Sequence, residues 1–289
     1  MAAIFYYDID WRTGGQHPGR HRSWHTGAGV EFRGHAPLLG AEDARRIDLL
    51  ASFKDPFGRW LVRTYRQRSA ISLYILADLS ASMRGLRRAG KWDALADLTE
   101  SAAESAFRSG DAFGFIGACE RPQPEFWLPA TRMRGAGAVM AAKLRRFVPD
   151  GHTAQGLLPA LARLPRRRAL VFLVSDFHFP LTQIDALIRG LSGHAVVPVI
   201  LWDRAEFSPR AGWRIHHVQD SESSDARVLL SRPTWRRELV SAYRERFELL
   251  RERFTHQHMP PLLLPDGFRA DLVTRHFIAR SAHFSADGR

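Results

Sequence analysis

The feature that most constrains the fold is a series of short, almost continuously apolar segments separated by segments with helical periodicity. Three of these segments, Ile71–Ala77, Ala169–Ser175 and Ala195–Trp202, are made almost entirely of apolar residues. Strands buried on both faces have this character, whereas half-buried strands alternate apolar and polar positions. Their alternation with helices predicts an α/β fold, a doubly wound and mostly parallel sheet covered on both faces.

The intervening segments carry apolar residues three and four positions apart, as amphipathic helices do. We expect helices over Lys91–Arg108, Val139–Phe147, Thr153–Leu164, Ile184–Leu191 and Thr234–Phe254, and a tail helix near Phe268–Phe277. Further strands are expected at Ala112–Gly117 and Glu125–Leu128, and a hairpin from Trp213–Gln219 and Ala226–Leu230. The chain should therefore end in a helical tail.

Residues 1–68 differ from the rest, because Gly, His, Pro and Arg cluster there and mark turns. A short strand at Val30–Phe32 and a helix over Ala41–Phe53 are expected in this region. We interpret residues 1–68 as an N-terminal extension packed on the core formed by residues 69–289.

Charge and cysteine content narrow the choice of partner and compartment. Lys and Arg number 42 against 30 Asp and Glu, a formal charge of +12, which favours an acidic partner. The arginines are scattered and no basic and aromatic residues interleave, so nucleic acid is the less favoured partner and stays an alternative. Cys119 is the single cysteine, Met1–Trp11 has no signal-peptide pattern, and no apolar run is long enough to span a bilayer. A cytoplasmic protein without a membrane segment is expected.

Oxygen-bearing side chains follow two of the predicted strands. Asp78-Leu-Ser80-Ala-Ser82 comes directly after Ile71–Ala77, and Asp176 comes directly after Ala169–Ser175. Thr153 opens the helix expected between them. Ligands in doubly wound folds bind at the carboxyl ends of the strands, so these five residues are expected to converge. Two carboxylates and three hydroxyls suit Mg²⁺ or Mn²⁺ rather than zinc. Taken singly, the hydroxyls could instead be helix N-caps and the aspartates polar strand exits.

These motifs together resemble the metal-ion-dependent adhesion site of von Willebrand factor A domains. The flanking sequence, Gly27-Ala-Gly29-Val-Glu31-Phe32 and Asp43-Ala-Arg45-Arg-Ile47-Asp48, is similar to the domain-of-unknown-function family number 58, whose members are often found beside MoxR-type AAA+ ATPases. The resemblance implies that Ser80, Ser82 and Thr153 contact the metal directly, and that Asp78 and Asp176 act mainly through water or hydrogen bonds. It also implies a MoxR-type ATPase as partner in a chaperone-like assembly. The chain departs from the family pattern at Gly40-Ala-Glu42-Asp43 and at Leu49.

A cation held mostly by neutral hydroxyls keeps much of its charge and an open position, which a carboxylate of another protein can fill. We therefore expect metal-dependent protein binding without catalysis. A metal-dependent phosphoesterase or nuclease is the second hypothesis, with His178 as the candidate general base, although a loop histidine is the simpler reading. The chain has no Gly-Lys-Ser phosphate loop and is not expected to be an ATPase itself.

Overall fold

A computed structural model of the chain describes residues 2–13, 17–38, 44–84, 90–149, 151–203, 206, 215–219, 226–230 and 233–286. The chain divides into two units, one formed by Met1–Asp8 with Ser72–Arg289 and the other by Ile9–Ile71. The expected boundary after residue 68 and the packing of the extension on the core stay predictions.

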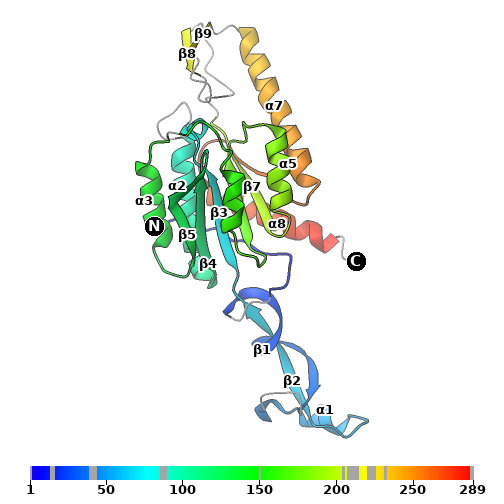
Figure 1. Cartoon of the computed structure of the whole chain (residues 1–289). Helices are drawn as coiled ribbons and strands as arrows, with labels where there is room; N and C mark the ends of the chain where they lie inside the picture. Colours follow the sequence, from blue (N-terminus) through cyan, green and yellow to red (C-terminus); the bar gives the residue numbers. More distant parts are fainter. Residues whose placement is uncertain are drawn as a thin grey trace. The chain divides into compact units, whose positions relative to one another are not determined.

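The larger unit contains a six-stranded sheet with the order β10-β7-β6-β3-β4-β5 (Figure 1). Its strands are β3 (Ser72–Asp78), β4 (Ala112–Ala118), β5 (Pro122–Thr131), β6 (Leu170–Ser175), β7 (Ala195–Leu201) and β10 (Leu262–Leu264). All neighbours pair in parallel except β4 and β5, which are antiparallel. This is the expected mostly parallel, doubly wound sheet.

The burial of each strand explains how visible it is in the sequence. Every residue of β4, β6 and β7 is buried, so these strands need apolar side chains on both faces. The edge strand β5 buries Phe126 but leaves Trp127 exposed, and only its Glu125–Leu128 part was expected. The three-residue strand β10 was not expected, because so short an apolar run carries no periodicity.

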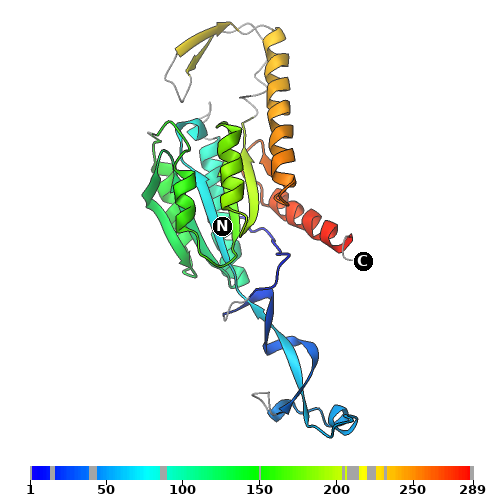
Figure 2. The same ribbon diagram turned by 45° about the vertical axis from the view of Figure 1, so that its right-hand side comes forward.

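Helices cover both faces of this sheet. They are α2 (Lys91–Ser109), α3 (Ala136–Arg146), α4 (Leu157–Ala160), α5 (Leu181–Gly190), α7 (Pro233–Thr255) and α8 (Ala270–Ala286). Apolar residues of α4, α5 and α7 share one buried cluster with Tyr74 of β3 and Leu173 of β6. The orange α7 leads through β10 into the red α8 (Figure 2). In the described part of the chain, no helix is both long and apolar enough to cross a membrane.

The face of the sheet opposite this buried cluster is covered by aromatic side chains from segments that are distant in sequence. The rings of Phe5 and Phe277 both meet Phe172 of β6 edge to face, with centroid separations of 5.9 and 6.1 Å. The backbone N–H of Phe5 donates to Ser105 Oγ of α2 (3.1 Å), and the Tyr7 hydroxyl donates to Asp111. The first residues of the chain therefore belong to the core of the larger unit.

The helix expected over Thr153–Leu164 is wrong at both ends, since α4 stops at Ala160 and a 3-10 turn follows at Leu161–Arg163. Residues 151–156 are not helical, and the helix α4 begins at Leu157. The reason lies in tertiary hydrogen bonds at both ends of this segment: the Ala81 N–H donates to Gly151 O (2.8 Å), and the Gly156 N–H donates to Cys119 O (2.7 Å). Thr153 is therefore a loop residue and not a helix N-cap.

The remaining expectations for the larger unit are met closely. The hairpin forms from β8 (Ile215–Gln219) and β9 (Ala226–Leu230), paired antiparallel. The helices α2, α3, α5 and α7 lie where they were expected, with ends that differ by up to three residues. The tail helix α8 begins two residues later and continues beyond Phe277.

The smaller unit is an antiparallel ribbon of β1 (Pro18–Pro37) and β2 (Leu61–Ser69). The strand expected at Val30–Phe32 is part of the much longer β1. The helix expected over Ala41–Phe53 is wrong in extent: the described part contains a 3-10 turn at Ala44–Arg46 and the short helix α1 (Leu49–Phe53), which Asp48 caps through the Ala51 N–H. The departure at residues 40–43 lies outside the described residues.

Candidate functional site

Asp78 and Asp176 lie at the carboxyl ends of two adjacent strands. β3 ends at Asp78 and β6 ends at Ser175, and the two strands pair in parallel up to Ala77 and Val174. From β3 the chain continues to β4 on one side, and from β6 it continues to β7 on the other. The two aspartates thus flank the point where the winding of the sheet reverses, which is where ligands bind in such folds.

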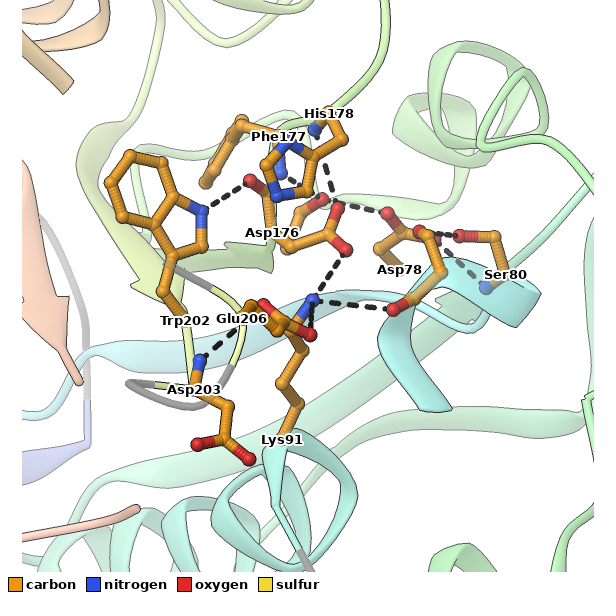
Figure 3. A network of polar contacts seen from close by, with 11 residues as sticks. Asp78, Ser80, Lys91, Asp176, Phe177, His178, Trp202, Asp203 and Glu206 are labelled. Carbon is orange, nitrogen blue, oxygen red and sulfur yellow. Dashed lines mark hydrogen bonds and ion pairs between the residues drawn. The ribbon is translucent and has the colours of Figure 1, made fainter. Parts of the chain in front are cut away.

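Both carboxylate oxygens of Asp78 are engaged by short hydrogen bonds (Figure 3). The Ser80 N–H donates to Oδ1 (2.9 Å) and the Ser175 hydroxyl donates to Oδ2 (2.6 Å). Asp78 is completely buried. Burial, together with the nearby negative charge of Asp176, raises the pKa of Asp78 to about 6. The raised pKa means that positive charge near the Asp78 carboxylate does not offset its burial.

The two serines of the Asp78-x-Ser80-x-Ser82 motif face each other. Their Oγ atoms are 3.1 Å apart, with Ser80 buried and Ser82 partly exposed. A 3-10 turn at Ala81–Arg84 sets this geometry. The Ala81 N–H within the turn donates to Gly151 O, so the loop that carries the half-buried Thr153 lies beside it. Two hydroxyls are therefore brought together with the aspartates, and a third is carried by the adjoining loop.

The turn after β6 holds Asp176 in a fixed position. The Ser175 Oγ accepts a hydrogen bond from the Phe177 N–H (2.9 Å), and Phe177 has the left-handed backbone angle φ 53°. The Trp202 indole N–H donates to the Asp176 carbonyl oxygen (2.9 Å). The ring of His178 stacks on Trp202 at a centroid distance of 5.9 Å and meets Tyr243 edge to face. His178 thus packs against aromatic rings.

Sequence reasoning missed Lys91, whose ammonium lies within this group of residues. Lys91 Nζ is 2.9 Å from Asp176 Oδ2 and 2.9 Å from Glu206 Oε1, and it donates to Ser82 O (3.3 Å) (Figure 3). Burial tends to lower the pKa of Lys91, but the charges of Asp176 and Glu206 outweigh it and raise that pKa. The same ammonium holds the pKa of Asp176 below its usual value against the effect of burial. A lysine in the first turn of α2 interacts unfavourably with the helix dipole, and this was the feature of the sequence that could have pointed to Lys91.

The donor set fits a hard divalent cation. The described part of the chain contains no group of three or more His, Cys, Asp or Glu side chains in metal-binding geometry, so a cation here would depend on hydroxyls. Ser80 and Ser82 offer two adjacent hydroxyl oxygens. Asp78, Asp176 and Glu206 bring three carboxylates against the single ammonium of Lys91. This excess of negative charge is what Mg²⁺ or Mn²⁺ would neutralise, and the metal-ligand role of the five residues stays a prediction.

Residues 39–248 match the family described as "Protein of unknown function DUF58". A relative from Paracoccus denitrificans, described as "Uncharacterized protein in moxR 3'region", is 28% identical over 99 residues, which is 34% of this chain and 94% of that protein.

Two solved structures from Bacteroides resemble the chain. One is an aerotolerance-related membrane protein from Bacteroides fragilis NCTC 9343, with a TM-score of 0.45 and 12% identity over 74% of this chain and 100% of that one. The other is the hypothetical protein BatB from Bacteroides thetaiotaomicron, with a TM-score of 0.44 and 11% identity over 75% of this chain and 100% of that one. Likenesses of this degree say nothing about activity.

Proposed function

The chain belongs to the DUF58 family, and from this premise we propose that it is a non-enzymatic protein-binding module that acts as an adaptor or partner of a MoxR-type AAA+ ATPase. It binds a carboxylate of an acidic protein through a Mg²⁺ or Mn²⁺ ion. The ATPase partner is supported by the relative whose name places it in a moxR 3' region. A cytoplasmic location is part of the proposal, because the chain's single cysteine is a buried free thiol.

The observation that carries the proposal is the meeting of Asp78, Ser80, Ser82 and Asp176 at the reversal point of the sheet. Ser80 and Ser82 would hold the ion together with Thr153. Asp78 and Asp176 would orient its remaining ligands. When bound, the ion supplies a positive charge that neutral hydroxyls do not cancel, so an incoming carboxylate is attracted to it. The basic chain, with a formal charge of +12, favours approach of an acidic partner.

Several contacts support binding rather than catalysis. Both oxygens of Asp78 accept hydrogen bonds, and Asp176 Oδ2 is paired with Lys91, so neither carboxylate is arranged as a direct ligand of a catalytic metal. The ring of His178 is packed against Trp202 and Tyr243, whereas a general base would need to face a substrate. A phosphoesterase or nuclease is therefore the weaker candidate.

The test is recovery of a MoxR-type ATPase from lysate by the tagged full-length chain, identified by mass spectrometry. We expect recovery in Mg²⁺, loss of recovery in EDTA, and loss for the Ser80→Ala/Ser82→Ala variant. Ser192→Ala is the matched control, because Ser192 is exposed and its hydroxyl only donates to Arg189 O. Recovery that ignores both EDTA and the double substitution contradicts the proposal.

Two further measurements decide the alternatives. Metal-dependent cleavage of a phosphoester or a nucleic acid by the purified chain, lost in the Ser80→Ala/Ser82→Ala variant, would make it a hydrolase. Salt-sensitive retention on nucleic acid that EDTA does not affect would make the arginines the binding surface. We expect neither result.

A further inference from the structure

Lys91 places a buried positive charge at the candidate site. The proposed binding of a partner carboxylate through a metal ion gives this charge no role. The Lys91 side chain is only 3% exposed, and its ammonium contacts oxygens from three separate segments: the Ser82 carbonyl, the Asp176 carboxylate after β6, and the Glu206 carboxylate after β7. Figure 3 shows the Lys91 ammonium beside the side chains of Asp176 and Glu206. Oxygens converging on one cation from several loops are also what a bound metal ion requires.

The choice of lysine at this position is informative. The chain has 42 basic residues, and Lys54, Lys91 and Lys143 are its only lysines. An ammonium is a compact charge with three donors, whereas a guanidinium is a planar fork suited to bidentate pairing. Three oxygens in different directions therefore suit lysine and not arginine. The position at the start of α2 is electrostatically unfavourable, so the carboxylates must provide the stabilisation.

We propose that the Lys91 ammonium is a resident cation of this site, which holds Asp176 and Glu206 in the absence of a divalent ion and thereby weakens the binding of such an ion. The inference rests on the proposed function, because it takes Ser80 and Ser82 as the ion's ligands. The Ser82 residue that would offer its hydroxyl to the metal also offers its carbonyl oxygen to Lys91. Two cations so close in a buried site repel each other strongly. Divalent binding must therefore overcome this repulsion or displace the ammonium.

A cavity beside Lys91 provides room for that displacement. It measures about 190 Å³ and is lined by Lys91 itself, Gly90, Trp202, Asp203 and Asp266, among others. The two aspartates give an ammonium that leaves Asp176 another acidic environment. Binding of a divalent ion is thus coupled to breaking of the Lys91–Glu206 ion pair. In the metal-free chain the Lys91 ammonium holds the carboxylates of the site until a divalent ion is abundant.

The test is calorimetric titration of Mn²⁺ into the metal-free full-length chain, without any partner protein. Lys91→Met removes the charge and keeps an unbranched side chain, and we expect it to bind Mn²⁺ at least about tenfold more tightly than the wild type, from the lost repulsion. Lys143→Met is the matched control, because Lys143 is exposed on α3, and its affinity should equal that of the wild type.

Lys91→Met leaves two buried carboxylates without their partner and can therefore fail to fold without metal. The variant Lys91→Gln removes the charge but keeps two N–H donors for Asp176 and Glu206, so it should fold and again bind Mn²⁺ more tightly than the wild type. A folded variant that binds Mn²⁺ no more tightly than the wild type overturns the inference and leaves Lys91 as a structural ion pair. Because the titration uses the chain alone, that result is distinct from failure to recover the ATPase, which would refute the proposed function.

Discussion

Ser175 links the two aspartates of the candidate site, and its removal allows a quantitative prediction. Its hydroxyl is completely buried; it donates to Asp78 Oδ2 (2.6 Å) and accepts from the Phe177 N–H (2.9 Å). The substitution Ser175→Ala removes both hydrogen bonds and leaves almost no cavity, because one oxygen atom is lost. The change in stability therefore reports the polar contacts and not the packing.

The magnitude follows from the two atoms that lose the Ser175 hydroxyl as partner, which are Asp78 Oδ2 and the backbone nitrogen of Phe177. Loss of a hydrogen bond to an ionised carboxylate costs about 1.5–3 kcal/mol, and a buried N–H without an acceptor costs about 1–3 kcal/mol. Phe177 also has the left-handed backbone angle φ 53°, which is unfavourable for a residue with a side chain. Since the two losses share one hydroxyl, we expect a total of about 3 kcal/mol, a large part of the roughly 5–15 kcal/mol that stabilises a domain.

Urea unfolding followed by circular dichroism measures this change, with the unfolding midpoint expected to fall at an unchanged slope. Ser192→Ala is the control, because its exposed hydroxyl donates to one carbonyl and its loss should cost less than about 0.5 kcal/mol. A loss below about 1 kcal/mol for Ser175→Ala would mean that water or a rearranged turn satisfies Asp78 and Phe177, and would refute the reasoning.

Three further predictions concern the surroundings of the site. At Gly156 a Cβ atom would lie 2.6 Å from the backbone of Arg121, so Gly156→Ala should displace the Thr153 loop, cost about 1–3 kcal/mol in urea unfolding and weaken Mn²⁺ binding in calorimetry, whereas Gly193→Ala, with open space at its Cβ, should do neither. Burial, followed by the charge of Arg280, lowers the pKa of His276 from 6.5 to about 4. The contribution of neutral His276 to the free energy of unfolding is therefore fully present above pH 6.5 and is lost as the pH falls towards 4. Between pH 7 and 5 the loss is about 2 kcal/mol. His276→Gln should remove that share of the pH dependence in urea unfolding, and an unchanged profile would contradict the assignment. Arg246 of α7 donates to Phe177 O (2.7 Å) and Phe179 O (2.5 Å), so Arg246→Met should speed amide exchange in the turn after β6, whereas the exposed Arg251→Met should not.

The central sheet was predictable because burial on both faces demands a recognisable composition. The segments that became β3, β6 and β7 have almost no polar residue, and their alternation with helical segments indicates a parallel sheet covered by helices. The proximity of Asp78 and Asp176 followed from the same pattern, because parallel strands end at a common edge. Weak elements were misjudged or missed where local pattern was absent, as in the edge strand β5 and the three-residue β10.

The sequence by itself thus determined the α/β class, the order of the main elements and the edge of the sheet where oxygen-bearing side chains gather. Only the tertiary structure decided which polar groups meet there, because hydrogen bonds between distant residues have no sequence periodicity. Lys91 and Glu206 are far apart in the chain and are paired by the fold at 2.9 Å. Thr153 is a loop residue and not a helix start, because the backbones of Ala81 and Cys119, which are distant in sequence, hydrogen-bond the backbone on either side of it. Local propensity cannot anticipate such contacts, since their stabilisation depends on the burial that folding creates.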